Sequence, residues 1–120
     1  MDINIAIIDQ NEIFRESLKT LMEQIPCFHV SISSGVNKCT DRLIGESTEV
    51  LLLDDCIGPE RCRSIIDEVR SNNKSLKIII LTLDHPSPDP GIGESGIMPK
   101  YSGKKDFEYR IKELFAPAMH

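Results

Sequence analysis

The 120-residue chain has no long hydrophobic run. A membrane-spanning helix needs about 20 consecutive apolar residues, whereas the apolar runs at residues 50–53 and 78–81 are far shorter. Runs of that length are typical of buried strands. The first residues also lack the basic segment with which a signal peptide begins. We therefore expect a cytoplasmic protein that does not contact a membrane.

Cysteine is scarce as well. The four cysteines contain no Cys-x-x-Cys pair and the three histidines are scattered, whereas a tetrahedral zinc site needs closely spaced ligand pairs. Four cysteines are also too few for a small domain held together by disulfides. We expect reduced thiols and no structural zinc, although Cys56 and Cys62 flank a loop in which they can come close.

The chain lacks an excess of basic residues. Its 14 Lys and Arg against 19 Asp and Glu give a formal net charge of -5. A nucleic-acid surface needs clustered positive charge, so we do not expect these residues to bind DNA directly. The composition, 40% hydrophobic and 28% charged, is that of a globular chain, and its length suits one domain.

Short apolar segments alternate with helical patterns along the chain. We expect five strands, at residues 4–8, 28–32, 50–53, 78–81 and 96–98. Apolar residues recur at helical spacing between and after them, at 13–25 before Pro26, more weakly at 36–44, at 65–69 and at 107–115. Strands that alternate with helices imply a parallel sheet with helices on both faces. The prediction is a doubly wound α/β domain with a five-stranded parallel sheet over residues 1–115, followed by a linker or tail at 116–120.

Residues 83–95 interrupt this alternation. They lie between the fourth and fifth expected strands, where the pattern calls for a helix. Pro86, Pro88 and Pro90 stand at every second position, and each removes a backbone donor and favours extended backbone. We therefore expect an irregular loop over residues 86–95 and a fourth helix that is missing or degenerate.

Polar side chains follow the expected strands. In such folds, ligands bind at the carboxyl ends of the strands, and the candidates there are Asp9, Gln10, Asp54, Asp55, Thr82 and Lys100. No glycine-rich phosphate loop and no Ser-His-acid arrangement accompanies them. Clustered carboxylates suit Mg²⁺, which prefers oxygen ligands. They also suit an aspartate that accepts a phosphoryl group while a metal ion and a lysine neutralise its charge.

The chain resembles the receiver domains of two-component response regulators, particularly those of the NarL/FixJ type. The similar segments are residues 5–19 (IAIIDQNEIFRESLK), 49–54 (EVLLLD), 78–82 (IIILT) and 96–100 (GIMPK). The resemblance implies a CheY-like fold and a signalling module, not an enzyme. Its phosphoaspartate would carry a signal from a histidine kinase to an output. It also implies a homodimer and transcriptional regulation through a DNA-binding domain outside these residues.

The resemblance also implies roles for individual residues. Asp54 corresponds to the phosphoacceptor. Asp55 is the alternative, because Pro59 lies four residues after it, where the family has its proline. Thr82 would hydrogen-bond the phosphoryl group, and Lys100 would pair with that group or with Asp54; as alternatives, Thr82 is an ordinary strand-end residue and Lys100 a surface lysine.

The same resemblance places Mg²⁺ at Asp9, Asp54 and Gln10. Asp9 has an alternative role as the cap of the following helix. Gln10 is a departure, because the family has a second acid there, and an amide brings no charge to the cation. We therefore expect weak phosphoryl uptake that depends little on Mg²⁺, unless Asp55 turns inward and restores the missing charge.

Two further departures are Ile97, where the family has an aromatic residue, and Tyr101, where it has a proline. Together with the irregular segment, they keep open a second reading, a degenerate pseudo-receiver that serves as a dimerisation or protein-binding module. Because the missing fourth helix leaves the family's usual dimer face incomplete, we expect any dimer to avoid residues 83–95 and to use other surfaces, such as the first and last helices. A flavodoxin-like enzyme or cofactor binder is a third reading, which the missing phosphate loop after Ile8 disfavours.

Overall fold

The computed structural model describes residues 2–35, 47–83 and 95–115. Its sheet has five strands: β1 (Ile3–Ile8), β2 (Phe28–Ser34), β3 (Val50–Asp54), β4 (Lys77–Thr82) and β5 (Gly96–Pro99). All neighbouring strands pair in parallel, in the order β2-β1-β3-β4-β5. The predicted doubly wound sheet is therefore confirmed. The weak helical pattern at 36–44 and most of the proline-rich segment lie outside the described residues.

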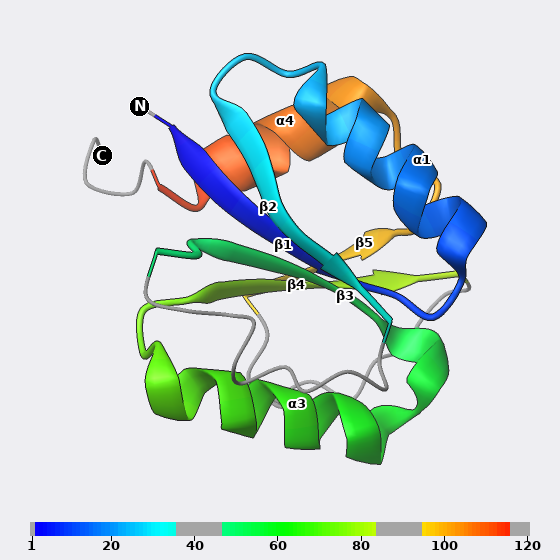
Figure 1. Ribbon diagram of the computed structural model, residues 1–120, viewed down its shortest axis with the longest axis vertical. Helices are drawn as coiled ribbons and strands as arrows, with labels where there is room; N and C mark the ends of the chain where they lie inside the picture. Colours follow the sequence, from blue (N-terminus) through cyan, green and yellow to red (C-terminus); the bar gives the residue numbers. More distant parts are fainter. Residues whose placement is uncertain (1, 36–46, 84–94, 116–120) are drawn as a thin grey trace.

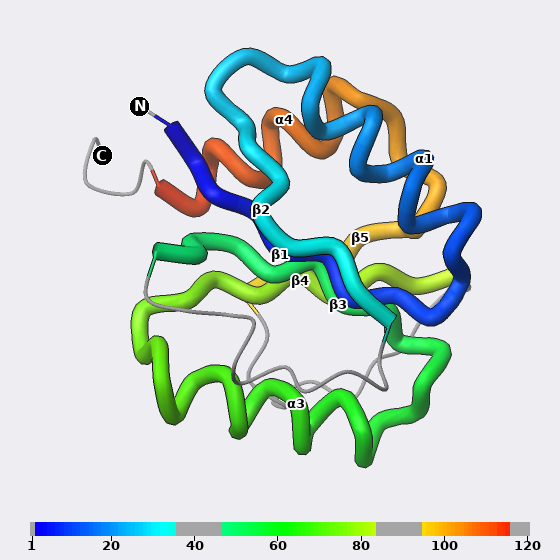
Figure 2. Tube along the Cα trace, viewed as in Figure 1, coloured from blue at the N-terminus to red at the C-terminus, as the bar shows by residue number. Residues whose placement is uncertain are grey.

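Helices cover both faces of this sheet. α1 (Glu12–Glu23) and α4 (Lys104–Glu113) lie on one face, and α3 (Pro59–Asn72) lies on the other (Figure 1, Figure 2). A short 3-10 turn, η1 (Asp55–Ile57), joins β3 to α3. Gly58 follows it with a φ of 98°, a conformation that costs glycine little. Pro59 then begins α3, where its missing N–H is not needed.

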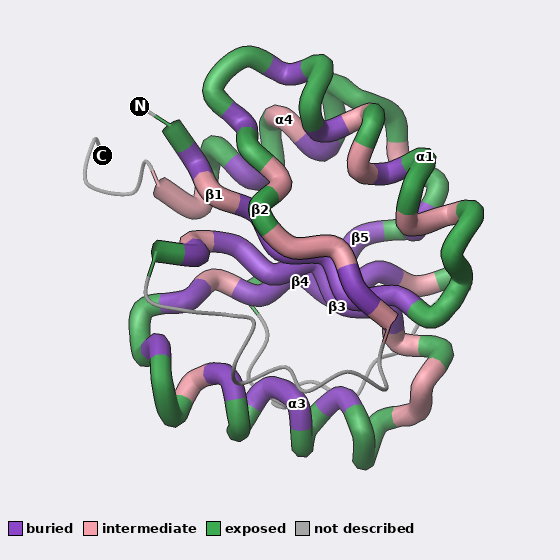
Figure 3. The backbone as a smooth tube through the Cα atoms, viewed as in Figure 1, coloured by how far each residue is buried: buried purple, intermediate pink, exposed green. Residues whose placement is uncertain are grey.

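The core lies on both sides of the central strand. Every residue of β3 is buried, as expected for a parallel strand covered on both faces. Leu52 belongs to the cluster under α1 and α4, which includes Met22 and Phe107. Leu53 belongs to the cluster under α3. β1, β3 and β4 are accordingly almost wholly buried, the edge strands β2 and β5 are only partly buried, and the helices show alternating buried and exposed positions (Figure 3).

The first helix differs in one respect from its sequence pattern. Ile13 belongs to the expected apolar stripe, but its side chain is 82% exposed. Leu18 and Met22 are the buried residues of α1, and Ile25 is buried just beyond the helix. Ile13 lies in the first turn, where it lines a groove at the edge of the sheet and does not pack on the core.

None of the helices in the described ranges combines the length and apolar character that a membrane span requires.

Phe107 provides the test of this packing, because its side chain lies on the inner face of α4 and is fully buried. We expect Phe107→Ala to lower the free energy of unfolding by about 3–5 kcal/mol, through lost burial and the cavity left behind. Tyr109→Ala, on the exposed side of the same helix, should cost less than about 1 kcal/mol. Urea denaturation measures both, and similar losses for the two variants would contradict this packing.

Candidate functional site

The carboxyl ends of the strands bring four of the predicted residues to one edge of the sheet. Asp9 follows β1, Asp54 ends β3 and Thr82 ends β4. Lys100 directly follows β5, and its backbone N–H donates to the Thr82 carbonyl at 2.8 Å. The order of the strands reverses between β1 and β3, which is where ligands bind in open α/β sheets.

The centre of the site is a buried lysine between two buried carboxylates. Lys100 Nζ lies 3.0 Å from Asp9 Oδ2 and 3.3 Å from Asp54 Oδ1. The three side chains are only 5%, 1% and 1% exposed, so the reading of Lys100 as a surface lysine is wrong. Two carboxylates against one ammonium leave one negative charge in excess when all are ionised. Such a charge is costly inside a protein unless a further partner offsets it.

Local backbone geometry fixes both carboxylates. Asp9 Oδ1 accepts a hydrogen bond from the Asn11 N–H at 2.8 Å, and Asp54 Oδ1 accepts one from the Cys56 N–H at 3.0 Å. Asn11, not Asp9, caps α1, since its side-chain oxygen accepts from the Phe14 N–H at 3.0 Å. The capping role considered for Asp9 is therefore wrong. Asp9 is directed into the site instead.

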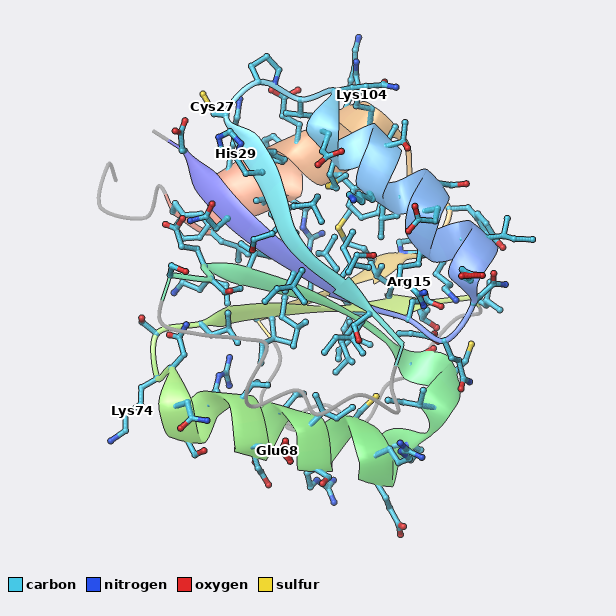
Figure 4. All side chains as sticks on the ribbon, viewed as in Figure 1. Arg15, Cys27, His29, Glu68, Lys74 and Lys104 are labelled. Atoms are coloured by element: carbon cyan, nitrogen blue, oxygen red, sulfur yellow. The ribbon has the colours of Figure 1, made fainter. Side chains whose placement is uncertain are left out.

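Arg15 secures the backbone of Asp9 from α1. One of its terminal guanidinium nitrogens donates to the Asp9 carbonyl at 2.7 Å. Figure 4 shows this side chain near the start of α1, far from Cys27 and Lys74. Arg15 of the first helix thus holds the backbone of Asp9 in place.

Burial and the contacts within the site act in opposite directions on the pKa values of Asp9 and Lys100. Burial raises the pKa of Asp9 above the ordinary value of 3.8, and the hydrogen bonds from Asn11 and Lys100 offset only part of that rise. Burial by itself would lower the pKa of Lys100, but the carboxylates of Asp9 and Asp54 outweigh it and raise that pKa above 10.5. Lys100 therefore stays charged at neutral pH.

A second group of ligand atoms adjoins Asp54. Carboxylate oxygens of Asp54 and Asp55 and the sulfur of Cys56 lie within 4.8 Å of one another. Asp54 Oδ2 is buried and accepts no hydrogen bond from the residues that the structure describes. A buried acceptor next to a second carboxylate fits a divalent cation with oxygen ligands. Gln10, the other metal position implied by the resemblance, is exposed.

Cys56 is the member of this group that sequence reasoning missed. Its only sequence signal was its place two residues after Asp54, which the 3-10 turn brings back toward that carboxylate. Partial desolvation and the neighbouring Asp54 raise the pKa of its thiol. Cys62 lies deeper, where burial raises its pKa to about 11. Both are free thiols, as is Cys27.

An aromatic pair covers the other side of Lys100. Lys100 Nζ lies 4.6 Å from the ring centroid of Phe14. Tyr101 meets that ring edge-on, with centroids 5.5 Å apart and planes at 86°. All three residues line a groove of about 480 Å³ between α1 and the residues that follow β5. Nothing in the sequence pattern had linked Phe14 to the site.

Solved structures share this architecture. One is the P1 domain of CheA3 in complex with CheY6 from R. sphaeroides, with 19% identity, a TM-score of 0.78 and coverage of 95% of this chain and 97% of that chain. A second is the RcsB response regulator of Salmonella typhimurium, with 20% identity, a TM-score of 0.69 and coverage of 97% and 62%. A third is described as a pilus assembly protein, CpaE, from Burkholderia thailandensis, with 14% identity, a TM-score of 0.80 and coverage of 95% and 98%.

These likenesses establish the CheY-like fold. No protein-family model and no curated protein matches the sequence. At such low identities, the structures with the same fold do not assign roles to individual residues of this chain. Those roles have to be argued from the site.

The substitution Asp9→Asn tests whether burial raises the pKa of Asp9. The folded chain holds the Asp9 proton more tightly than the unfolded chain, so ionisation of Asp9 reduces stability as the pH rises above 3.8. Asparagine carries no such cost. We therefore expect the stability of Asp9→Asn, relative to the unsubstituted protein, to increase from pH 3.8 toward neutrality. Urea denaturation across this range measures it, and a constant difference would contradict the expectation.

Proposed function

We propose that the chain is a receiver domain that accepts a phosphoryl group from a histidine kinase at Asp54. The observation that carries this proposal is the buried contact of Lys100 with Asp9 and Asp54 at the carboxyl edge of the sheet. A lysine held against an acceptor carboxylate is placed to neutralise charge that arrives with a phosphoryl group. The CheY-like fold and the ordered sequence segments support the same function.

In the proposed reaction, a carboxylate oxygen of Asp54 attacks phosphorus while the bond from phosphorus to the donor histidine nitrogen breaks. An acyl phosphate forms on Asp54, and the donor nitrogen keeps the electron pair of the broken bond. Lys100 stays protonated and pairs with the added oxygens. Thr82, half-buried at the end of β4 beside β3, is our candidate for a hydrogen bond to one of them.

Mg²⁺ is the cofactor that this reaction implies. We propose that Asp54 and Asp55 hold it, with Asp9 contributing charge, because the carboxylate oxygens of Asp54 and Asp55 lie close together. The cation would supply positive charge that offsets the approaching phosphoryl oxygens. Asp55 is half-buried at the start of η1, where it is the second carboxylate of the proposed site, while Gln10 still brings no charge to it.

The partners follow from this function. A histidine kinase is the proposed phosphoryl donor, and a partner protein is in keeping with the neighbour in which CheY6 is complexed with the P1 domain of CheA3. We propose a DNA-binding domain as the output. RcsB is described as a response regulator that interacts with DNA, and this chain matches only 62% of the RcsB chain. A homodimer through α1 and α4 and a cytoplasmic location complete the proposal.

A phosphorylation-independent interaction module is the second candidate. It is favoured by Gln10, which is exposed where an acid would be expected to bind the cation. The fold by itself does not decide between the candidates, because a protein described as a pilus assembly protein shares it. The decisive difference is whether Asp54 forms a covalent adduct.

Incubation with acetyl phosphate, followed by intact mass spectrometry, tests the proposal. We expect slow labelling with one phosphoryl group that disappears in Asp54→Asn, because Asp54 supplies the attacking oxygen. Labelling that is lost only in Asp55→Asn would show that Asp55, and not Asp54, is the acceptor. No labelling at all, with or without Mg²⁺, would favour the interaction module.

Gln10→Asp tests the reason for the slow reaction. A restored acid should bind Mg²⁺ more tightly, and we expect labelling at limiting Mg²⁺ to rise by about tenfold, equivalent to roughly 1.4 kcal/mol. Gln24→Asp, at the end of α1 away from the site, is the matched control and should change nothing. An equal response of the two variants would show that Gln10 does not limit the site.

A further inference from the structure

Phe14 connects the first helix to the lysine of the site. Its ring lies 4.6 Å from Lys100 Nζ, a separation at which a cation is attracted to the face of an aromatic ring. The ammonium is almost wholly buried, so this attraction acts with little screening by water. Phe14 is therefore in contact with the group that holds the two carboxylates together.

A continuous series of contacts links Phe14, Lys100, Asp9 and Asn11. Asp9 accepts from the Asn11 N–H, and Asn11 accepts from the Phe14 N–H through its capping side chain. Phe14 contacts Lys100, and Lys100 Nζ lies 3.0 Å from Asp9 Oδ2. The cap that begins α1 thus fixes the position of the ring relative to the site.

Tyr101 contacts the ring of Phe14. Its ring meets the Phe14 ring edge-on at 5.5 Å, a favourable arrangement for two aromatic rings. Tyr101 is itself 75% exposed, and Phe14 is half-buried beneath it. This residue stands where the receiver family has a proline, so the pair is a feature of this chain.

We propose that Phe14, supported by Tyr101, is a positioning residue that keeps the Lys100 ammonium directed at Asp9 and Asp54. Without the aromatic face, the ammonium would be free to turn toward the groove beside it, which Lys100 already lines. An effect of Phe14 on the rate of phosphoryl transfer rests on the proposed function, because it appears only if Asp54 accepts a phosphoryl group. The position of Lys100 does not depend on that function.

Nuclear magnetic resonance of the lysine ε-CH₂ groups tests the position directly. We expect the Lys100 signal, identified by its absence in Lys100→Arg, to be shifted upfield by the Phe14 ring. Phe14→Leu keeps an apolar side chain but removes the ring, so the signal should move toward those of exposed lysines. Phe14→Tyr should retain the shift. Tyr101→Ala, an exposed substitution with little risk to folding, should give a smaller displacement in the same direction.

Ile13→Ala is the matched control, because Ile13 neighbours Phe14 and lines the same groove but is 82% exposed. It should leave the Lys100 signal in place. A Lys100 signal that is unchanged in Phe14→Leu, or equally displaced in Ile13→Ala, would overturn the proposal.

Labelling with acetyl phosphate gives the kinetic readout on the same variants. We expect roughly fivefold slower labelling in Phe14→Leu, near-normal labelling in Phe14→Tyr, and no change in Ile13→Ala. If the unsubstituted protein is not labelled, the proposed function fails, and the lysine signals still decide whether Phe14 positions Lys100. Normal labelling in Phe14→Leu would overturn the kinetic role.

Discussion

The contact of one buried ammonium with two buried carboxylates is the constraint on which the site depends. Asp9 and Asp54 come from strands that are neighbours in the sheet, and Lys100 reaches both from the far side of β4. Neither carboxylate would be tolerated there alone, because an unpaired charge is costly away from water. The three residues thus combine a structural requirement with the charge arrangement on which the proposed phosphoryl transfer rests.

The site retains this charge arrangement while departing from the receiver pattern around it. Gln10 brings no charge, but Asp55 lies with Asp54 in the adjacent group of ligand atoms. Tyr101 replaces a proline and, through Phe14, adds an aromatic cover over Lys100. In the proposed function, the change at Gln10 bears on the binding of Mg²⁺ and the change at Tyr101 bears on the position of the Lys100 ammonium.

The sequence was sufficient for the fold because its signals are strong and local. Residues 50–53 are apolar throughout, which predicted the fully buried β3, and the polar residues after each strand predicted the edge that carries the site. The exposure of Ile13 could not be read from helical spacing, which does not say how far the sheet extends beneath a helix. The contacts of Phe14 and Cys56 depend on side-chain directions in the folded chain, which single-sequence patterns do not contain.

A double-mutant cycle between Lys100 and Asp54 tests the central claim most directly. Lys100→Met alone should lower the free energy of unfolding by about 3–5 kcal/mol, because it leaves two buried carboxylates without their cation. In the Asp54→Asn background the same substitution should cost at least about 1 kcal/mol less, since one of those charges is gone. Urea denaturation of the four proteins gives this difference. Additive effects, within about 0.5 kcal/mol, would contradict a buried interaction between Lys100 and Asp54.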